Sequence, residues 1–159
     1  MIKIAVISDT HGNLSAIDKM AQIILESDYV FHLGDHFDDM KNYAHVLGNK
    51  LYRVHGNCDW GTQKEIVVKI VEHKIFATHG DVYGAKRGVD KLIEKAKQEN
   101  CSVVFYGHTH VAEIKKQDGI LLINPGTLQK YSASKTFAYI IINNDKIIPT
   151  INETFFYGI

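Results

Sequence analysis

Residues 2–11 read Ile-Lys-Ile-Ala-Val-Ile-Ser-Asp-Thr-His, an apolar run that leads directly into a polar segment. The apolar part predicts a buried first strand near residues 2–8. Asp9 and His11 then follow the end of that strand. In α/β sheets, ligands bind outside the carboxyl ends of the strands. This stretch therefore predicts the first core strand and the beginning of a binding site.

Outward from this strand, the first half of the chain alternates helix-like and strand-like segments. Apolar residues between positions 14 and 25 recur at helical spacing behind Asn13, whose side chain suits an N-cap. Strands are predicted near residues 29–33 and 51–54, and apolar residues at 37, 40, 44 and 47 predict a short helix between them. This βαβαβ order predicts a parallel sheet.

The second half of the chain predicts hairpins. Strand-like runs at 66–71 and 74–78 flank Glu72-His73, those at 112–117 and 120–123 flank Asp118-Gly119, and those at 136–142 and 146–151 flank residues 143–145. An amphipathic helix around residues 89–96 precedes a strand at 103–106. The expected fold is α/β: two packed, mainly mixed β-sheets flanked by helices in an αββα sandwich. Without a repeat or linker, residues 1–159 are expected to form a single domain.

The composition is that of an ordinary globular protein. Hydrophobic residues make up 45% and charged residues 23%, and 18 basic residues balance 18 acidic ones. This balance argues against binding of duplex nucleic acid and favours a small anionic substrate. The first apolar run is too short for a signal peptide, no other run approaches the length of a membrane span, and Cys58 and Cys101 are expected to be free thiols. We therefore expect a cytoplasmic protein with no membrane segment.

Short polar segments follow the predicted strands at five places. Within Asp9-x-His11 and His108-x-His110 the two side chains lie two residues apart, and in extended backbone such residues project to the same side. Strand ends that meet at one edge can bring all five segments to one crevice. The segments are residues 8–11, 34–35, 56–59, 78–80 and 107–110.

The side chains in these segments form a candidate set of metal ligands. Histidine and aspartate with one amide and no thiolate suit manganese, which we expect here, or nickel, cobalt, iron or zinc, rather than calcium or magnesium. Seven ligands are too many for one open mononuclear site, whereas two metals about 3.5–4 Å apart use them and leave room for a bridging hydroxide. The seven are Asp9, His11, Asp35, Asn57, His79, His108 and His110.

The order Asp-x-His, Gly-Asp, Gly-Asn-x-Asp, His, Gly-His-x-His resembles the signature of the calcineurin-like metallophosphoesterases. The resemblance spans residues 9–110. Gly-Asn-Cys-Asp at 56–59 and Asn124-Pro125-Gly126 resemble in particular the small microbial phosphodiesterases of that family. The resemblance implies that one metal takes Asp9, His11, Asp35 and His110, and the other takes Asp35, Asn57, His79 and His108. It makes Asp35 the bridging ligand.

Other residues near these motifs have supporting roles in this interpretation. His36 could reach the pocket rim, Asp59 is expected to orient metal-bound groups, and Asn124 and Gly126 are expected to form part of the pocket wall. Cys58 stands where the broader family commonly has a histidine that protonates the leaving group, and we expect it to be a small buried space-filler. Four further histidines match no motif position and are expected to be structural: His32, His45, His55 and His73.

The predicted reaction is hydrolysis of a phosphodiester by the metal-bridging hydroxide, with Asp35, Asn57, His79 and His108 as the catalytic group. Two alternatives remain: a phosphomonoesterase or nucleotidase, and a non-catalytic binding scaffold similar to the retromer-subunit branch of the same fold family. The expected partner is a small phosphodiester or nucleotide-like substrate. A homodimer or higher homo-oligomer stays open, and the aromatic residues 155–157 would mark its contact if they were exposed.

Overall fold

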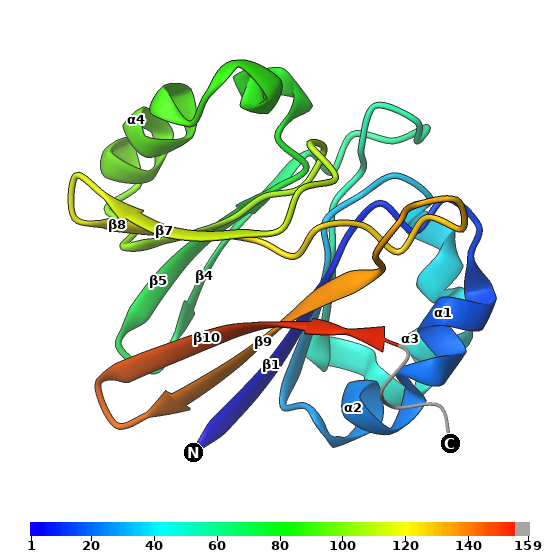
Figure 1. Ribbon diagram of the computed structural model, residues 1–159. Coiled ribbons are helices and arrows are strands. Elements are labelled where there is room, and N and C mark those ends of the chain that lie inside the picture. The colour runs from blue at the N-terminus through cyan, green and yellow to red at the C-terminus, as the bar shows by residue number, and fades with distance from the viewer. Residues whose placement is uncertain (155–159) are drawn as a thin grey trace.

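The computed structural model describes residues 1–154 and contains two five-stranded sheets that face each other (Figure 1). The first sheet has the strand order β10-β9-β1-β2-β3, and the second has the order β4-β5-β6-β8-β7. The predicted sandwich of two mixed sheets is confirmed. Residues 155–157, named above as a contact surface, lie outside the described residues.

In the first sheet, three parallel strands follow one another and a hairpin closes one side. β1 (Ile2–Ile7), β2 (Tyr29–His32) and β3 (Leu51–Arg53) are parallel, while β9 (Thr136–Asn143) runs antiparallel to both β1 and β10 (Lys146–Glu153). The parallel part is the βαβαβ half that the sequence predicts. Its three carboxyl ends therefore meet at one edge.

The second sheet places its parallel strands in the centre. β5 (His73–Thr78), β6 (Val103–Phe105) and β8 (Ile120–Asn124) are parallel, and β4 (Glu65–Ile70) and β7 (Glu113–Gln117) are antiparallel edge strands. The first hairpin turns at Val71-Glu72, one residue earlier than predicted, and His73 is already paired with Ile70. This register directs Ile75 and Ala77 into the core, and a slip of one residue would turn them outward.

Helices cover the outer faces of both sheets. α1 (Leu14–Lys19), α2 (Ala21–Glu26) and α3 (Lys41–Leu47) pack on the first sheet, and α4 (Asp90–Gln98) packs on the second (Figure 1). Asn13 caps α1 through a hydrogen bond from the Ala16 N–H to its side-chain oxygen, as predicted. The single helix expected over residues 14–25 is instead divided at Met20, which is fully buried. Among the described residues, no helix is long and apolar enough to cross a bilayer.

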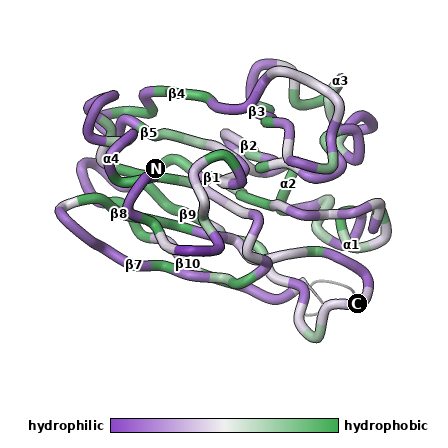
Figure 2. The backbone as a smooth tube through the Cα atoms, turned by 90° about the horizontal axis from the view of Figure 1, so that it is seen from above, coloured by the Kyte–Doolittle hydropathy of each residue, from purple (hydrophilic) through white to green (hydrophobic). Residues whose placement is uncertain are grey.

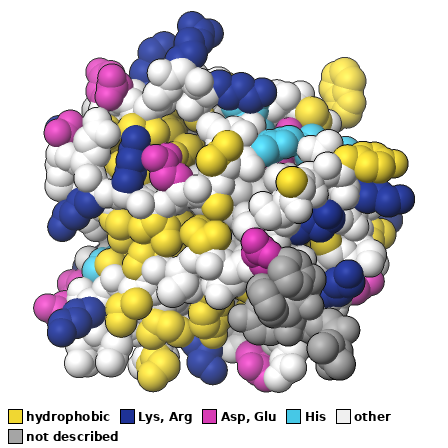
Figure 3. All heavy atoms as spheres, viewed as in Figure 1, with side chains coloured by type: hydrophobic (Ala, Val, Ile, Leu, Met, Phe, Trp, Pro, Cys, Tyr) yellow, Lys and Arg dark blue, Asp and Glu magenta, His cyan; other side chains and the backbone are white. Residues whose placement is uncertain are grey.

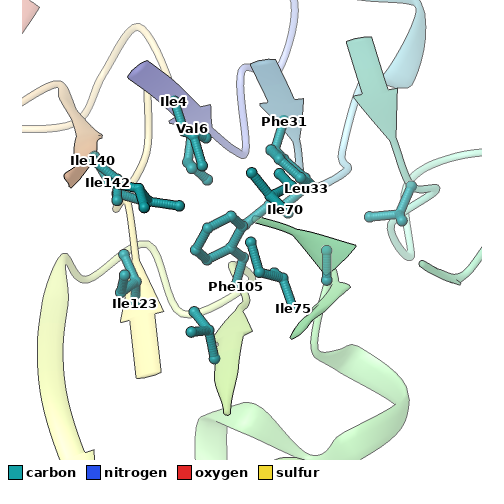
Figure 4. Close-up of a cluster of buried hydrophobic side chains, with 14 residues drawn as sticks. Ile4, Val6, Phe31, Leu33, Ile70, Ile75, Phe105, Ile123, Ile140 and Ile142 are labelled. Atoms are coloured by element: carbon teal, nitrogen blue, oxygen red, sulfur yellow. The ribbon is translucent and has the colours of Figure 1, made fainter. Parts of the chain in front are cut away.

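The main core lies between the two sheets. Phe31 and Phe105 meet there edge to face, with ring centroids 5.0 Å apart (Figure 4). The hydropathy pattern follows the layers, since green, apolar segments run along strands of both sheets while the helices, the loops and the edge strand β7 carry many hydrophilic residues (Figure 2). The two sheets therefore depend on the apolar contacts that hold them face to face.

We predict that Phe105→Ala lowers the free energy of unfolding by about 3–5 kcal/mol, because a buried aromatic ring leaves a cavity at the contact between the sheets. Urea denaturation followed by circular dichroism measures the change. Val46→Ala is the control, since Val46 is 71% exposed on α3 and should change stability by no more than about 0.5 kcal/mol. Equal losses in the two variants would contradict the core position of Phe105.

Candidate metal centre

The five predicted polar segments come together where strands of both sheets end. Backbone hydrogen bonds join their loops: the Asp9 N–H donates to the Gly34 carbonyl at 2.9 Å, and the Gly107 N–H donates to the His79 carbonyl at 2.8 Å. Several histidine side chains gather at the surface in this part of the molecule (Figure 3). The crevice expected from the sequence is therefore formed by the loops of both sheets.

The backbone of these loops is left-handed rather than extended. The φ angles are 54° at Asp9 and 44° at His11, and 70° at His108 and 62° at His110. The expectation that extended backbone aims each pair to the same side is therefore wrong, because β1 and β6 have already ended before these residues. A positive φ at a residue other than glycine is uncommon and costs free energy. Tertiary hydrogen bonds must hold these residues in place.

Four of the predicted ligands form a compact cluster. Asp9, His11, Asp35 and His110 each offer one ligand atom, and these atoms lie within 4.8 Å of one another. The Asp9 Oδ1 atom is 3.0 Å from the His110 Nε2 atom and 3.8 Å from the His11 Nε2 atom. This spacing would allow one small ion to contact all four groups.

The carboxylate of Asp9 is fully buried, and its two oxygens have different surroundings. Its Oδ2 atom accepts hydrogen bonds from the Ser8 hydroxyl at 2.5 Å and from the His108 N–H at 3.1 Å. Its Oδ1 atom accepts no hydrogen bond in the described chain, although the His110 Nε2 atom lies 3.0 Å away, and the buried His11 Nε2 atom makes no hydrogen bond either. Burial raises the pKa of Asp9, but His11, His110, His79 and Ser8 together lower it below its usual range. A buried, ionised oxygen that accepts no hydrogen bond and is surrounded by histidine nitrogens is an environment that a cation would satisfy.

A second group of predicted ligands surrounds His79. The His79 Nδ1 atom lies 2.7 Å from the Leu33 carbonyl oxygen, which directs Nε2 into the crevice. That Nε2 atom is 3.0 Å from the Asn57 Oδ1 atom, 3.2 Å from the His108 Nδ1 atom and 3.4 Å from the Asp35 Oδ2 atom. Burial lowers the pKa of His79, but Asp35 and Asp9 raise it overall, whereas burial and His79 lower the pKa of His108.

Asp35 lies between the two groups. Its Oδ2 atom is 3.5 Å from the His11 Nε2 atom and 3.4 Å from the His79 Nε2 atom, while its Oδ1 atom accepts the Cys58 N–H at 2.9 Å. Burial raises the pKa of Asp35, but His79 and the Cys58 N–H lower it overall to about 2. Asp35 is therefore ionised at neutral pH, and its carboxylate faces both groups of predicted ligands.

Asp59 holds two of these loops together. Its carboxylate accepts four backbone N–H groups, from Asp35 at 2.9 Å, His36 at 2.8 Å, Phe37 at 3.0 Å and Gly56 at 2.8 Å. These bonds join the loop after β2 to the loop after β3. Burial raises the pKa of Asp59, and these hydrogen bonds lower it overall. Its contacts are with backbone that positions Asp35.

A buried polar chain supports the site and was not predicted from the sequence. The Gly34 N–H donates to the His32 Nδ1 atom at 3.1 Å, so the neutral ring carries its proton on Nε2 and donates to the Thr10 hydroxyl at 2.9 Å. Thr10 donates in turn to the Asp39 carboxylate at 2.6 Å, which also accepts the Gly12 N–H. Burial lowers the pKa of His32 to about 4, which keeps it neutral. The only sequence signal was the position of Thr10 inside Asp9-x-His11.

Two predicted pocket-wall residues lie behind the site. Asn124 is fully buried and donates to the Gly107 carbonyl at 3.2 Å and the Thr109 hydroxyl at 3.0 Å. Its Oδ1 atom accepts the Gly126 N–H at 2.9 Å, and Gly126 is itself buried. Asn124 therefore anchors the loop after β6, and Gly126 holds Asn124 in place.

His36 and Cys58 lie at the mouth of the crevice. The His36 ring is 5.3 Å from the His11 ring, and its side chain is 45% exposed, as a rim position requires. Cys58 is also exposed, so the expected role as a buried space-filler is wrong. The reason is that the Cys58 N–H reaches inward to Asp35, which leaves its side chain outside. Partial burial and Asp35 raise the pKa of the thiol.

The fold and this centre are those of one protein family. The model of the calcineurin-like phosphoesterase superfamily domain matches residues 2–146, and the chain belongs to that family. A probable metallophosphoesterase of Bacillus subtilis, YsnB, is 28% identical over 94% of this chain and 89% of its own length. Phosphodiesterase MJ0936 of Methanocaldococcus jannaschii is 30% identical over 79% of this chain and 83% of its own.

Solved structures agree on the fold. A predicted phosphoesterase from Streptococcus pneumoniae superposes with a TM-score of 0.80 at 25% identity, covering 96% of this chain and 90% of that one. Vacuolar Protein Sorting 29 from Cryptosporidium parvum superposes with a TM-score of 0.74 at 20% identity, covering 96% and 97% of the two chains. At that identity the second likeness concerns the fold alone.

We predict that Gly56→Ala weakens Mn²⁺ binding at least about tenfold, by displacing Asp35. A Cβ atom at position 56 would lie 2.1 Å from the Asp35 Oδ1 atom and 2.6 Å from the Asp35 nitrogen. Isothermal titration calorimetry of chelator-stripped protein measures the affinity. Gly119→Ala is the control, because a Cβ atom there meets nothing within 4 Å and only the positive φ is strained. Unchanged Mn²⁺ affinity in Gly56→Ala would indicate that Asp35 does not contribute to metal binding.

Proposed function

We propose that this protein hydrolyses phosphodiesters with two divalent transition metals held by the seven residues predicted from the sequence. The observation that supports the proposal is the pair of buried atoms Asp9 Oδ1 and His11 Nε2, which make no hydrogen bond and lie 3.8 Å apart in the first cluster. Two such atoms without hydrogen bonds would be costly in a native protein unless a ligand satisfies them.

The residues present fit the proposed metals. One ion would take Asp9, His11, Asp35 and His110, the other would take Asp35, Asn57, His79 and His108, and Asp35 would bridge, since it faces a histidine of each group. The mixed nitrogen and oxygen donors suit manganese first, then nickel, cobalt, iron or zinc. Two bound dications would supply an activated water-derived nucleophile at neutral pH and would neutralise charge on the phosphate oxygens.

The chain itself contributes orientation and electrostatics in this proposal. The Leu33 carbonyl fixes the ring of His79, and the Ser8 hydroxyl and His108 N–H fix the carboxylate of Asp9. A thiol nucleophile is not favoured, because partial burial and Asp35 raise the pKa of Cys58. These fixed groups preorganise the site, which is how electrostatic catalysis avoids reorganisation during reaction.

Two alternatives are weaker. A phosphomonoesterase or nucleotidase would use the same centre, and a comparison of rates on diesters and monoesters distinguishes it. A non-catalytic scaffold, suggested by the likeness to Vacuolar Protein Sorting 29, does not require a buried Asp9 Oδ1 atom and a His11 Nε2 atom that make no hydrogen bond. Function follows the site rather than the fold, and here the site favours hydrolysis.

We predict that chelation abolishes hydrolysis of bis(p-nitrophenyl) phosphate and that Mn²⁺, Co²⁺ or Ni²⁺ restores it best. Asp35→Asn should lose about 10–100-fold more activity than His11→Ala, because one replacement weakens both metal positions and the other weakens one. Metal content measured by mass spectrometry should be two ions per chain in the wild type and should fall further in Asp35→Asn than in His11→Ala. Full activity in excess chelator would exclude the proposed mechanism, and retention of both metals by Asp35→Asn would exclude the bridge.

We predict a steep dependence of rate on the pKa of the leaving group, because a thiol with a raised pKa is a poor proton donor at position 58. Aryl diesters should react well and alkyl diesters poorly. Cys58→His should narrow this difference, since general acid catalysis typically contributes about 10²–10⁴-fold. Cys101→Ala is the control, as Cys101 is buried on the far side of the second sheet next to α4. If the wild type shows no such dependence, another residue donates the proton, and His36 is the first to replace.

A further inference from the structure

A surface pocket of about 310 Å³ adjoins the candidate metal centre. Two of its residues directly follow predicted ligands, His36 after Asp35 and Cys58 after Asn57. A volume of this size accepts one ring-bearing group rather than a large ligand. Rings and carboxylates dominate its lining, which includes His36, Phe37, Asp38, His55, Cys58 and Trp60.

Trp60 is the only tryptophan of the chain and is fully exposed in this pocket. In the part of the chain that the structure describes, no aromatic ring stacks on it. A large apolar ring left in water beside a functional site often marks a binding surface.

The backbone on both sides of Trp60 is held firmly. Asp59 accepts four backbone N–H groups from two loops, as described above. Gly61 packs so closely on the ring of His55 that a Cβ atom there would lie 2.2 Å from the His55 Nε2 atom. The exposure of Trp60 is therefore built into an anchored loop.

The other rings form a wall beside Trp60. Phe37 stacks on His55 with ring centroids 4.0 Å apart, and the guanidinium carbon of Arg53 lies 4.1 Å from the Phe37 centroid. Phe37 is thus packed by its own neighbours. Trp60 is the fully exposed ring of this pocket, and its face is therefore free to stack on a ligand.

Two pockets near the metal centre differ in charge. The Trp60 pocket is lined by Asp38, Asp39 and Asp59 and by no lysine or arginine. A second pocket, of about 450 Å³, contains His11, Lys130 and Tyr131. Carboxylates repel a further phosphate, whereas Lys130 attracts one. The Trp60 pocket therefore suits an uncharged group.

We propose that the Trp60 pocket binds the neutral ring of the ester, a nucleobase or an aryl group, and that Trp60 stacks on this ring. The inference rests on the proposed diesterase function and names its substrate class: a phosphodiester with one ring-bearing arm that carries no additional phosphate. Trp60 is a specificity-determining residue, because it contacts the arm and not the reacting phosphate.

Fluorescence tests this pocket without turnover, because Trp60 is the single tryptophan. Adenosine should quench the emission saturably in the metal-loaded protein and also in the chelated protein, whereas ribose 5-phosphate should not. Tyr131→Ala is the matched control, since Tyr131 is 86% exposed in the second pocket and its loss should leave adenosine binding unchanged. An emission that does not respond to adenosine would overturn the proposal.

Kinetics with thymidine 5′-(4-nitrophenyl phosphate) provide the second test. Trp60→Leu should raise KM about 5- to 100-fold, the effect expected for loss of one stacked base, while Trp60→Phe should restore KM to within about threefold. An unchanged KM in Trp60→Leu would overturn the proposal. A Trp60→Leu variant whose oligomeric mass changes while its KM does not would show instead that Trp60 contacts a second copy of the chain. Adenosine quenching without metal-dependent hydrolysis would refute the diesterase function but would still support binding of a neutral ring in the Trp60 pocket.

Discussion

The hydrogen bond from the His108 N–H to the carboxylate of Asp9 joins residues that are 99 positions apart and belong to the two different sheets. A second contact between loops of the two sheets joins the His79 ring to the Leu33 carbonyl. A bond from the Gly107 N–H to the His79 carbonyl joins two loops of the second sheet. The inter-sheet core around Phe105 brings the sheets together, but these bonds fix how their ends meet. Without that alignment, the carboxylates and imidazoles would be separate polar groups at the ends of strands.

This alignment is maintained against local backbone preference. Asp9, His11, Asp35, His108 and His110 all have positive φ, a conformation that costs on the order of 1–3 kcal/mol per residue and persists only where the surroundings enforce it. The surroundings here are specific, because Asp59 alone accepts four backbone N–H groups around Asp35. Glycine at positions 56 and 107 lets backbone approach the carboxylates of Asp35 and Asp9. The site therefore combines strained ligand residues with a rigid hydrogen-bonded support.

The same fold occurs in proteins whose names indicate different roles, a phosphoesterase and a vacuolar sorting protein among them. A layered sandwich can present its loops for catalysis or for contact with other proteins, so the fold does not distinguish the two. The chemistry of this chain lies at one edge of the sheets, where buried, ionised Asp9 and Asp35 face His11 and His79. Two pockets near that edge differ in charge, since one contains Asp38 and the other contains Lys130.

By itself, the sequence determined the two sheets, the family and which polar segments would meet, because strand periodicity and the order of the motifs are local properties of the chain. It also indicated the N-cap at Asn13. Only the tertiary structure decided the left-handed loops, the division of the first helix at Met20, the exposure of Cys58 and the burial of Asn124. These features depend on hydrogen bonds and packing between segments far apart in the chain, and a local pattern contains no record of such partners.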